Sequence, residues 1–470
     1  MTKKRNNEAI DYRLWGLTCN GHGELLIGGC STLELAAKYG TPLHVVNESR
    51  LIKTAGNFLE TLENIYPEKV SVHFAMKCNA VPGVVDMVRK TGLKAEVMSE
   101  FELEIARHIG YSGRDVIVNG PFKPDRLLNA CLEYGTRFII IDSLAELRNL
   151  ERLCVTAGQH ADILLRINPD YIPQGMNQGS ATGSRKGCAF GLDLKGGEVD
   201  EALKAIHGMS RVKFWGFHFH IGTGIQNPED YCKALESLRD IIARTFQSGH
   251  QIEVFDVGGG FAASTSRGMT TGEMLLYEAF DRLPQAGRTR SSIPIQKFAK
   301  AVTMGMKKLF GAGNLPELIL EPGRCIASSN QLLLLQVHQV KKRTGLRKWL
   351  ITDGGIGTVT MPTYYEYHEV FLCNDINRTR HEKVTITGPV CFAGDIVYRN
   401  KAMPEVYPGE ILAIMDSGAY FTAWESSFGF ARPAIVAAAG GKHRLLRRRE
   451  EFADMIARDC IPESIQTITN

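Results

Sequence analysis

The residues of this chain that are best suited to chemistry come at the ends of short β-like runs. They are Lys77, Ser99, Glu100, Asn119, Gly120, Asp142, His218, His220, Gly258, Gly259, Gly260, Glu321 and Arg324, with Arg166 inside its own run. A lysine, two histidines, carboxylates and arginines brought to one edge could bind an anion, bond covalently to a carbonyl and move protons.

Three consecutive glycines, Gly258 to Gly260, are the most informative of these residues. Consecutive glycines allow backbone N–H groups to close around an anion. Taken alone, such a triplet is more often a tight turn. Its place after the seventh of eight runs favours a phosphate site, because barrels commonly hold a phosphate beside strands seven and eight.

Lys77 follows an apolar run and is expected in the mouth of the same pocket. Most lysines simply face solvent. A partly desolvated lysine, however, can lose its proton and form a Schiff base with an aldehyde. Beside a phosphate cradle, this favours pyridoxal phosphate, which carries both an aldehyde and a phosphate, with Glu321 as the candidate partner of its ring nitrogen.

His218 and His220 leave two interpretations open. Alternate residues of a strand share a face, so the pair could bind a metal ion. The sequence shows no third group of ligands, which makes a metal site the minority interpretation. We prefer an imidazole that stacks on the cofactor ring and expect no metal.

The elements that must position these residues form a repeating pattern of β-like runs and helical stretches. The runs cover residues 70–76, 93–98, 115–118, 137–141, 162–167, 212–219, 251–257 and 317–320, and the helical spacings cover 101–108, 126–134, 144–155 and 231–248. Alternation predicts a parallel sheet, and eight units predict an α/β fold with a (β/α)₈ TIM-type barrel.

The flanking segments predict a β-rich second domain built from both ends of the chain. Strand-like segments at 25–27 and 42–46 surround a short helix at 33–39, and further strand-like segments lie at 332–340, 349–352, 384–387, 396–398 and 411–415. We therefore divide the chain into an N-terminal segment, 1–48, that joins the β domain, a cofactor-binding barrel, 49–325, and a C-terminal β-rich domain, 326–470. Residues 171–186 and 264–271 read as loops, the first of them a candidate lid.

Length and composition agree with a soluble chain of several domains. The chain has 470 residues, of which 44% are hydrophobic and 23% charged, too many residues for one core. Its 55 basic and 51 acidic residues give a net charge of +4, which does not favour nucleic acid as a partner. The basic run at 442–449 is followed by two glutamates, which predicts a solvated helix face.

The cysteines and the N-terminus bear on location. Eleven cysteines without a C-x-x-C pair predict reduced thiols rather than a disulfide framework or a zinc site. The polar N-terminus has no apolar signal region, and no apolar run approaches the length of a membrane span. We therefore expect a cytoplasmic protein with no membrane partner.

Several strings of residues, in matching order over nearly the whole chain, resemble the fold-type III pyridoxal-phosphate decarboxylases. This family includes diaminopimelate and ornithine/arginine decarboxylases and shares its barrel with alanine racemase. The strings are Tyr39-Gly-Thr-Pro-Leu-His-Val45, His73-Phe-Ala-Met-Lys-Cys-Asn79, Glu96-Val-Met-Ser-Glu-Phe-Glu-Leu103, His218-Phe-His-Ile-Gly-Thr223, Asp256-Val-Gly-Gly-Gly-Phe261, Glu321-Pro-Gly-Arg324, Gly388-Pro-Val-Cys-Phe-Ala-Gly-Asp395, Asp416-Ser-Gly-Ala-Tyr420 and Arg458-Asp-Cys-Ile-Pro462.

The resemblance implies a role for each matching residue. Lys77 would be the internal aldimine lysine, His220 would stack on the ring, and Glu321 would pair with the pyridine nitrogen. Other expected contacts to the cofactor are Glu96, Ser99, Arg166, Thr223, Gly258, Gly259, Gly260, Gly323, Arg324 and Tyr420. Cys391 of the partner subunit would protonate Cα after carbon dioxide leaves, which implies a homodimer with shared active sites.

Two departures from the family pattern bear on the substrate. Met361 stands where the diaminopimelate branch has an arginine, and Phe392 stands where an acid follows the cysteine. Apolar groups cannot replace a carboxylate clamp or an amine acceptor. We therefore predict a modified, conjugated or carrier-linked amino acid, as in siderophore or secondary-metabolite biosynthesis.

The residues expected to bind this substrate are Arg324, Met361, Tyr365, Phe392 and Asp395, and Glu366 or Asp395 could take a distal charge. The alternatives are a diaminopimelate, ornithine or lysine decarboxylase, a pyridoxal-phosphate racemase and a non-catalytic regulatory homologue. A racemase would need a second acid or base on the opposite face of the ring. A regulatory homologue would be expected to lose Lys77 or the phosphate-binding residues, and both are present.

Overall fold

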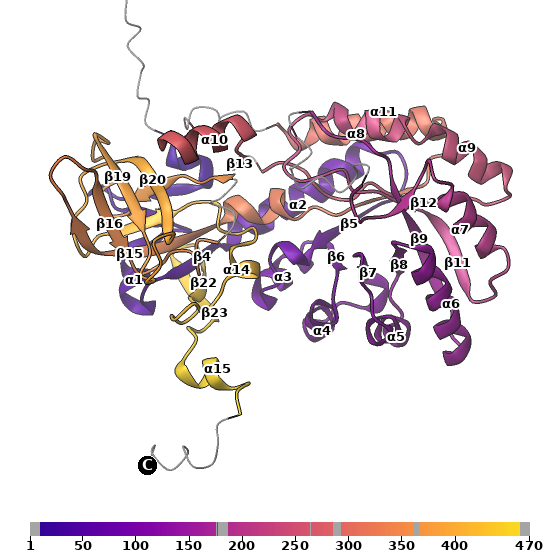
Figure 1. Ribbon diagram of the computed structural model, residues 1–470, viewed down its shortest axis with the longest axis horizontal. Coiled ribbons are helices and arrows are strands. Elements are labelled where there is room, and N and C mark those ends of the chain that lie inside the picture. The colour runs from indigo at the N-terminus through magenta and orange to yellow at the C-terminus, as the bar shows by residue number, and fades with distance from the viewer. Residues whose placement is uncertain are drawn as a thin grey trace, which may run out of the picture.

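A computed structural model describes residues 10–174, 176, 187–263, 265–284, 293–360 and 366–460, with the side chain of residue 267 left aside. The chain forms two parts that lie side by side, a barrel and a β-rich domain (Figure 1). Helix α2 (Glu48–Ile65) runs between them. The predicted fold class, a barrel with a second β-rich domain, is confirmed.

Eight parallel strands close the barrel. They pair in the order β5 (Val70–Ala75), β6 (Lys94–Val97), β7 (Val116–Val118), β8 (Phe138–Ile141), β9 (Ala161–Asn168), β11 (Val212–His218), β12 (Val254–Asp256) and β14 (Glu317–Leu320), and β14 pairs with β5. A short strand, β10 (Leu192–Asp193), adds to β9 outside the ring. All eight predicted runs are therefore barrel strands.

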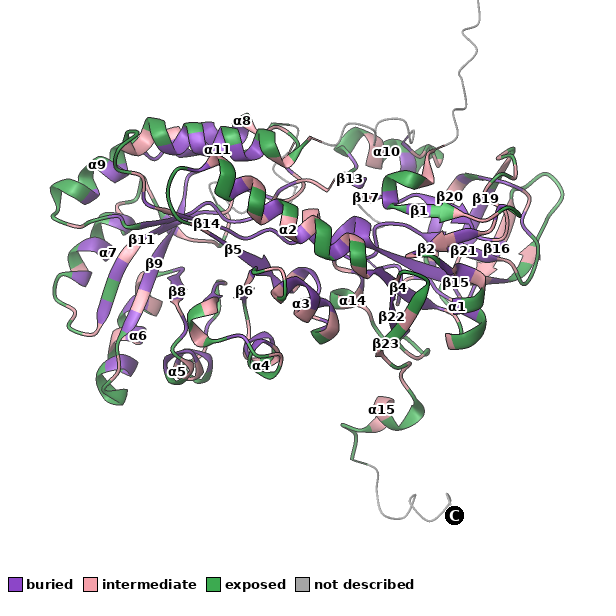
Figure 2. Ribbon diagram, turned by 180° about the vertical axis from the view of Figure 1, so that it is seen from behind, coloured by how far each residue is buried: buried purple, intermediate pink, exposed green. Residues whose placement is uncertain are grey.

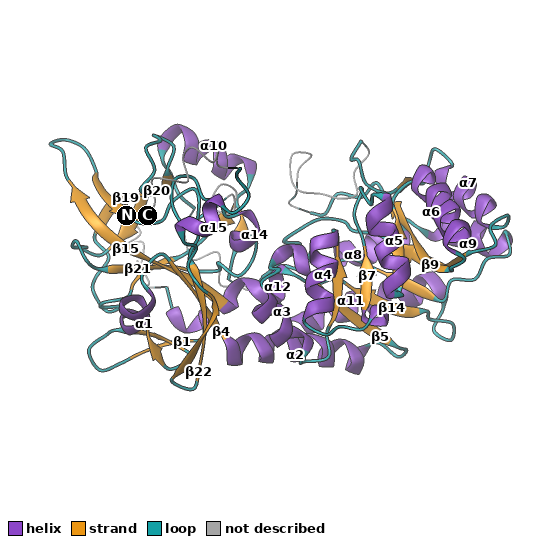
Figure 3. Ribbon diagram, turned by 90° about the horizontal axis from the view of Figure 1, so that it is seen from below, coloured by secondary structure: helices purple, strands orange, loops and turns teal. Residues whose placement is uncertain are grey.

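Helices surround these strands (Figure 3). They are α3 (Pro82–Arg89), α4 (Glu100–His108), α5 (Asp125–Tyr134), α6 (Leu144–Ala157), α7 (Glu198–Ile206), α8 (Glu229–Glu236), α9 (Arg239–Gln247) and α11 (Ile295–Phe310). Local chemistry sets several ends: the Ser99 and Ser143 hydroxyls cap α4 and α6 by accepting an N–H of the first turn, and left-handed Gly135 and Gly158 end α5 and α6.

The single helix predicted over residues 231–248 is wrong, because the structure has two helices there, α8 and α9. The break falls at Ser237 and Leu238. The Ser237 hydroxyl donates to the carbonyl oxygen of Ala234 at 2.7 Å, a local bond that competes with regular helix.

An apolar plug fills the barrel interior, and the outer faces of the strands pack against the helices. The plug consists of Ile117, Phe138, Ile140, Leu164, Val254 and Ile319. Figure 2 shows that the strands are the most buried part of the barrel. Apolar residues fill the middle of the barrel, and the polar residues Lys77, Asn119, His220 and Glu321 follow the C-terminal ends of their strands at its mouth.

The β-rich domain is one large sheet with strands from both ends of the chain. Its order is β20 (Ile396–Met403), β19 (Glu382–Thr387), β16 (Lys348–Thr352), β15 (Gln331–Lys341), β4 (Leu43–Asn47), β22 (Ala434–Ala439) and β23 (Lys442–Arg447), and β21 (Ile411–Ile414) pairs with both β15 and β18 (Val370–Leu372). Strand β4 lies between β15 and β22, so the N-terminal segment is part of the core of this sheet. The division of the chain at residues 48 and 325 stays a prediction.

Smaller elements complete this domain. They are β1 (Leu17–Cys19), β2 (Leu25–Ile27), β3 (Cys30–Ser31), α1 (Thr32–Tyr39), α10 (Thr271–Phe280), α12 (Arg324–Ala327), α14 (Phe421–Trp424) and α15 (Phe452–Ile456). Strand β13 (Arg267–Gly268) pairs antiparallel with β17 (Glu366–Tyr367). The segment predicted as a loop at 264–271 thus ties the barrel to the β-rich domain.

Two further sequence expectations need comment. The basic run at 442–449 is not a helix face, because residues 442–447 form strand β23. Gly440 and Gly441, both at positive φ, turn the chain between β22 and β23, as a two-residue hairpin requires. Residues 175 and 177–186 of the candidate lid lie outside the described residues. Within the described part of the chain, no helix combines the length and apolar character needed to cross a membrane.

Candidate active site

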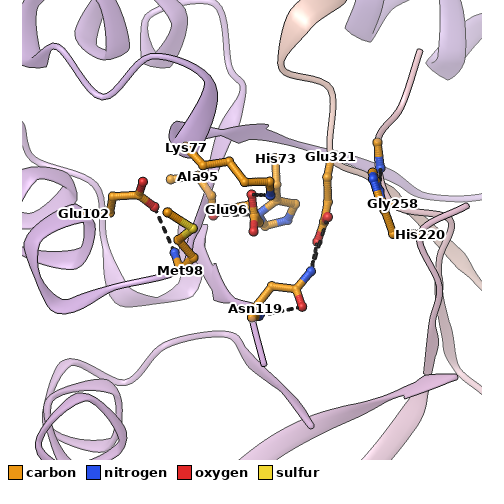
Figure 4. A network of polar contacts seen from close by, with 12 residues as sticks. His73, Lys77, Ala95, Glu96, Met98, Glu102, Asn119, His220, Gly258 and Glu321 are labelled. Atoms are coloured by element: carbon orange, nitrogen blue, oxygen red, sulfur yellow. Dashed lines mark hydrogen bonds and ion pairs between the residues drawn. The ribbon is translucent and has the colours of Figure 1, made fainter. Parts of the chain in front are cut away.

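Lys77 lies in a short 3₁₀ helix that follows β5, and its Nζ is 2.5 Å from Oε2 of Glu96 on the neighbouring strand β6. Figure 4 shows the lysine pointing toward this carboxylate. Burial would lower the pKa of Lys77, but Glu96 and Glu321 outweigh burial and raise it. Burial raises the pKa of Glu96 to about 7 against the effect of Lys77. Glu96 is therefore suited to accept a proton when the amine becomes a nucleophile.

Glu321, directly after β14, is a buried carboxylate that takes its partners from two other strands. The Nδ2 atom of Asn119 lies 3.2 Å and 3.4 Å from its two oxygens, and Nε2 of His218 lies 3.5 Å from Oε2. Asn119 Oδ1 accepts the N–H of Gly120, which turns the amide nitrogen toward Glu321 (Figure 4). Burial would raise the pKa of Glu321, but His218 and Lys77 hold it well below its usual range. It is a fixed anion, suited to pair with a protonated ring nitrogen.

Asp256, at the end of β12, completes this network. Ligand atoms of His218, Asp256 and Glu321 all lie within 4.8 Å of one another, a spacing that a metal ion could also use. Burial and the charge of Glu321 raise the pKa of Asp256 far above its usual value, and burial lowers the pKa of His218. Asp256 and His218 thus approach the Glu321 carboxylate from the ends of two neighbouring strands, β12 and β11.

His220 follows β11 and faces the glycine triplet. Its Nδ1 accepts the N–H of Gly259 at 3.2 Å. Burial, with Arg166 nearby, lowers the pKa of His220 to about 3, so the ring is a neutral imidazole. A neutral ring anchored at its edge leaves its faces available for stacking.

The glycine triplet forms a cradle that larger residues could not build. Gly258 and Gly260 have φ of +64° and +95°. A Cβ on Gly258, Gly259 or Gly260 would collide with a backbone carbonyl oxygen, respectively that of Phe219, Glu321 and Gly222. Helix α12 begins at Arg324, directly after the β14 loop. Loops after strands seven and eight with a short extra helix are where barrels bind phosphate.

Arg324 and Tyr420 join the β-rich domain to this mouth. The guanidinium of Arg324 lies over the Tyr420 ring, 4.8 Å from its centroid. The Tyr420 N–H donates to the carbonyl oxygen of Cys78 at 2.8 Å, next to Lys77. Arg324 Nη1 also lies 2.5 Å from Oε1 of Glu366 on β17.

Other predicted cofactor ligands have partners of their own. The Ser99 hydroxyl accepts the N–H of Glu102 as the cap of α4. Arg166 lies 3.4 Å from Asp142 and over the ring of Phe190. Thr223 is partly exposed in the loop after β11. Their contacts with a cofactor stay predictions.

Two of the substrate-binding residues predicted in the β-rich domain, Asp395 and Phe392, are described, and Asp395 makes its hydrogen bonds within that domain rather than with the Lys77 network. Asp395 is buried, and its two oxygens accept the N–H groups of Ile356 at 2.6 Å and Val390 at 2.8 Å. It holds the turn that exposes Cys391 and Phe392. Met361 and Tyr365 lie outside the described residues.

Sequence reasoning missed three contributions. It noted Asn119 at a strand end without a role, it did not single out Asp256, and it did not foresee that Glu366 meets Arg324. A polar residue at the end of a predicted barrel strand was the available signal for the first two, since such ends converge at the mouth. The third depends on the pairing of β13 with β17, two strands of two residues each.

Residues 50–328 match the family model described as "Pyridoxal-dependent decarboxylase, pyridoxal binding domain". The chain belongs to this family. It is an enzyme of the pyridoxal-phosphate-dependent carboxy-lyases, as the sequence predicted.

Relatives match over nearly their whole lengths. A diaminopimelate decarboxylase of Actinosynnema pretiosum is 32% identical over 456 residues, 96% of each chain. One of Methanocaldococcus jannaschii is 29% identical over 446 residues, 94% of this chain and 96% of the relative. The crystal structure of the M. jannaschii enzyme in complex with L-lysine has a TM-score of 0.83 at 28% identity and covers 95% of this chain and 98% of that one.

The described residues fit pyridoxal phosphate. Lys77 offers an amine for the aldehyde, Glu321 an anion for the ring nitrogen, and the glycine cradle a place for the phosphate. His220 offers a neutral imidazole ring that could stack on the cofactor ring. When bound, the cofactor supplies an electron sink for the bond that breaks at the substrate α-carbon.

Proposed function

We propose that this enzyme decarboxylates diaminopimelate, an acid with an amino-acid group at each end. The observation that carries the proposal is the pairing of Lys77 with the buried Glu96 beside the Glu321 anion, which suits attachment of the cofactor aldehyde and pairing with its ring nitrogen, as α-decarboxylation requires. Relatives named diaminopimelate decarboxylases support this substrate. These relatives favour diaminopimelate over the modified or carrier-linked amino acid that we predicted from Met361 and Phe392.

In the proposed reaction each residue of the mouth has one task. Glu96 accepts the proton of Lys77 as the lysine binds the cofactor aldehyde. Glu321, fixed by Asn119, holds the ring nitrogen in its protonated form. His220 would stack on the ring, and the cradle with Thr223, Gly323 and Tyr420 would hold the phosphate.

We further propose that Cys391 returns the proton to Cα in the active site of a partner subunit. The exposed position of Cys391 supports this, because a donor in its own chain's mouth would be enclosed. Exposed apolar side chains lie in the same domain as Cys391: Phe392, Trp424, Phe428 and Phe430 are each about half exposed. In the barrel, Met98 and Phe122, on the loops after β6 and β7, and Phe101, in the first turn of α4, are also exposed. Two such apolar surfaces are expected of a homodimer interface.

The proposal is tested with the full chain loaded with pyridoxal phosphate. Carbon dioxide release is measured from meso-diaminopimelate, L-lysine, D- and L-ornithine and an acylated diamino acid, and the product is identified by mass spectrometry. We expect release from diaminopimelate with formation of lysine. Release only from the acylated acid would restore the modified substrate, and racemisation without release would favour the racemase.

A further inference from the structure

The loop after β14 carries two charged residues, Glu321 and Arg324, and only the first is used by the network around Lys77. Arg324 instead meets Glu366, with Nη1 and Oε1 2.5 Å apart and side chains only 11% and 12% exposed. The second oxygen of Glu366 lies 3.4 Å from Nε2 of His368. The pairing of Gly268 with Glu366 places this acid of the β-rich domain against the barrel.

Both members of the pair stay charged. Burial would raise the pKa of Glu366, but Arg324 and His368 outweigh burial and lower it. Burial would lower the pKa of Arg324, but Glu366 and Tyr420 raise it. A buried ion pair often adds little to stability compared with apolar residues of similar size. Recognition of a charged group explains such a pair better than folding does.

The pair lies at the edge of the active site. Arg324 covers the Tyr420 ring. Burial is the main cause that raises the pKa of Tyr420 to about 12, and the charges of Arg324, Lys77 and Glu366 all contribute to its value. The backbone of Tyr420 contacts Cys78, next to Lys77, and its ring lies under Arg324, which pairs with Glu366, so one tyrosine links the reacting end of the site to this acid.

Other acids described at this mouth are already used. Glu96 faces Lys77, and Glu321 accepts from Asn119. Asp395 lies away from the mouth, in the β-rich domain, where both of its oxygens accept backbone N–H groups. Glu366 is held by side chains alone, which can exchange partners when a ligand arrives.

We propose that Glu366 determines specificity by accepting the distal ammonium of the substrate, while Arg324 takes the distal carboxylate. The inference rests on the proposed function. The far end of diaminopimelate carries one ammonium and one carboxylate, so a pair of one acid and one arginine matches it in number and sign. When the substrate binds, Glu366 would pair with its distal ammonium and Arg324 with its distal carboxylate instead of with each other, so the buried region would stay neutral.

The test compares Glu366→Gln with the unchanged holoenzyme on two acids. One is meso-diaminopimelate, and the other is 2-aminopimelate, which lacks the distal amine. We expect the variant to raise KM for diaminopimelate about 10- to 100-fold, because a charged acceptor is lost. KM for 2-aminopimelate and kcat for both acids should change by less than about 3-fold, because neither depends on that acceptor.

Two further measurements separate recognition from a structural role. The Kd of L-lysine for the holoenzyme, measured by calorimetry, should rise by a similar factor without turnover, while cofactor absorbance stays unchanged. Glu366→Asp keeps the charge and should recover most of the loss. As a matched control, Glu382→Gln removes the acid of an ion pair with Lys348 in the same domain and should change neither KM.

The outcomes distinguish this inference from the function on which it rests. Equal changes of KM for the two acids, or an unchanged KM for diaminopimelate, would overturn the role of Glu366 and leave decarboxylation standing. A wild-type enzyme that releases carbon dioxide from neither acid would overturn the proposed function. Should Glu366→Gln not fold, the wild-type holoenzyme is compared on the two acids, and equal KM values for diaminopimelate and 2-aminopimelate overturn the inference.

Discussion

Lys77 and Cys391, the two reactive side chains of the proposed reaction, lie in opposite surroundings. Lys77 is held by Glu96 on the next barrel strand, inside a network of buried acids and amides. Cys391 is exposed on a turn between β19 and β20. One end of the proposed active site is thus complete within a single chain, whereas the proton-donating end lies open on the surface of the β-rich domain.

The difference follows from how each region is built. The C-terminal ends of the parallel strands all lie at one face of a closed barrel, so residues distant in sequence meet there. A turn at the edge of an antiparallel sheet has no such convergence and faces outward unless another surface covers it. The proposed chemistry of Cys391 would therefore depend on a second chain, whereas the proposed chemistry of the barrel would not.

The largest effect is expected from a substitution of Lys77, in the part of the proposed active site that a single chain builds. Lys77→Ala removes the amine that binds the cofactor aldehyde and should lower carbon dioxide release by at least about 10³-fold. The absorbance band of the bound cofactor should disappear with it. Lys69→Ala, which removes an exposed partner of Glu317 at the opposite end of the barrel, is the control and should alter neither. Persistence of the band in Lys77→Ala would show that another residue holds the cofactor.

The next largest effect is expected from a substitution of Cys391, the exposed reactive residue of the β-rich domain. Cys391→Ala should keep the cofactor absorbance but reduce amine formation about 10²- to 10⁴-fold, the usual contribution of a general acid. Cys460→Ala, at another exposed cysteine, should have no effect. Unchanged turnover of Cys391→Ala would mean that the proton comes from elsewhere.

Mixing the two inactive variants tests whether the open end serves another chain. In random dimers of Lys77→Ala and Cys391→Ala, half are mixed and each mixed dimer has one intact site, so activity should recover to about one quarter of wild type. No recovery after subunit exchange would place both residues in the site of one chain.

The same contrast explains what could be predicted from the sequence. Barrel strands are apolar runs that end in polar residues, and their regular alternation with helices predicted all eight, together with Lys77, His220 and Glu321 at their ends. The local signals were strong because each strand and its polar end are adjacent in sequence.

The β-rich domain was predicted less completely, because its key features depend on turns and on distant pairing. Gly440-Gly441 is a hairpin signal, yet the basic residues after it were taken for a helix. Nothing near Glu366 in sequence indicates Arg324, since the two meet through pairing of β13 with β17. Asp395 was predicted to bind substrate, whereas in the structure its oxygens accept the backbone N–H groups of Val390 in its own turn and of Ile356 in another segment.

A smaller loss of stability and turnover is expected from Asp395→Asn, which loosens the turn that carries Cys391. Asp395→Asn replaces a carboxylate that accepts two backbone N–H groups by an amide with one acceptor, which should lower the free energy of unfolding by about 1.5–3 kcal/mol. Release of carbon dioxide should fall less than in Cys391→Ala, because the thiol is displaced rather than removed. Melting temperature and turnover are measured beside Asp375→Asn, an acid that accepts the N–H of Asn377 on a more exposed turn. Equal melting temperatures of the two variants would contradict a holding role for Asp395.

The smallest effect compares the two regions through acid stability. His44 on β4 and His73 on β5 are both fully buried, and burial lowers the pKa of each to about 3. In the unfolded chain each histidine binds a proton near pH 6.5, whereas in the folded chain it stays neutral until about pH 3. The free energy of unfolding therefore falls as pH drops from about 6.5 toward 3. Each histidine contributes at most about 1.4 kcal/mol per pH unit.

His44→Gln and His73→Gln should therefore each flatten the decline of melting temperature between pH 6.5 and 5, whatever they do to stability at pH 8. If the β-rich domain and the barrel melt separately, each substitution should flatten only the transition of its own region, because a histidine couples to pH only through the unit in which it is buried. A common slope for both variants and the unchanged protein would mean that neither histidine is kept neutral by folding. Both regions would then depend on other groups for their response to acid.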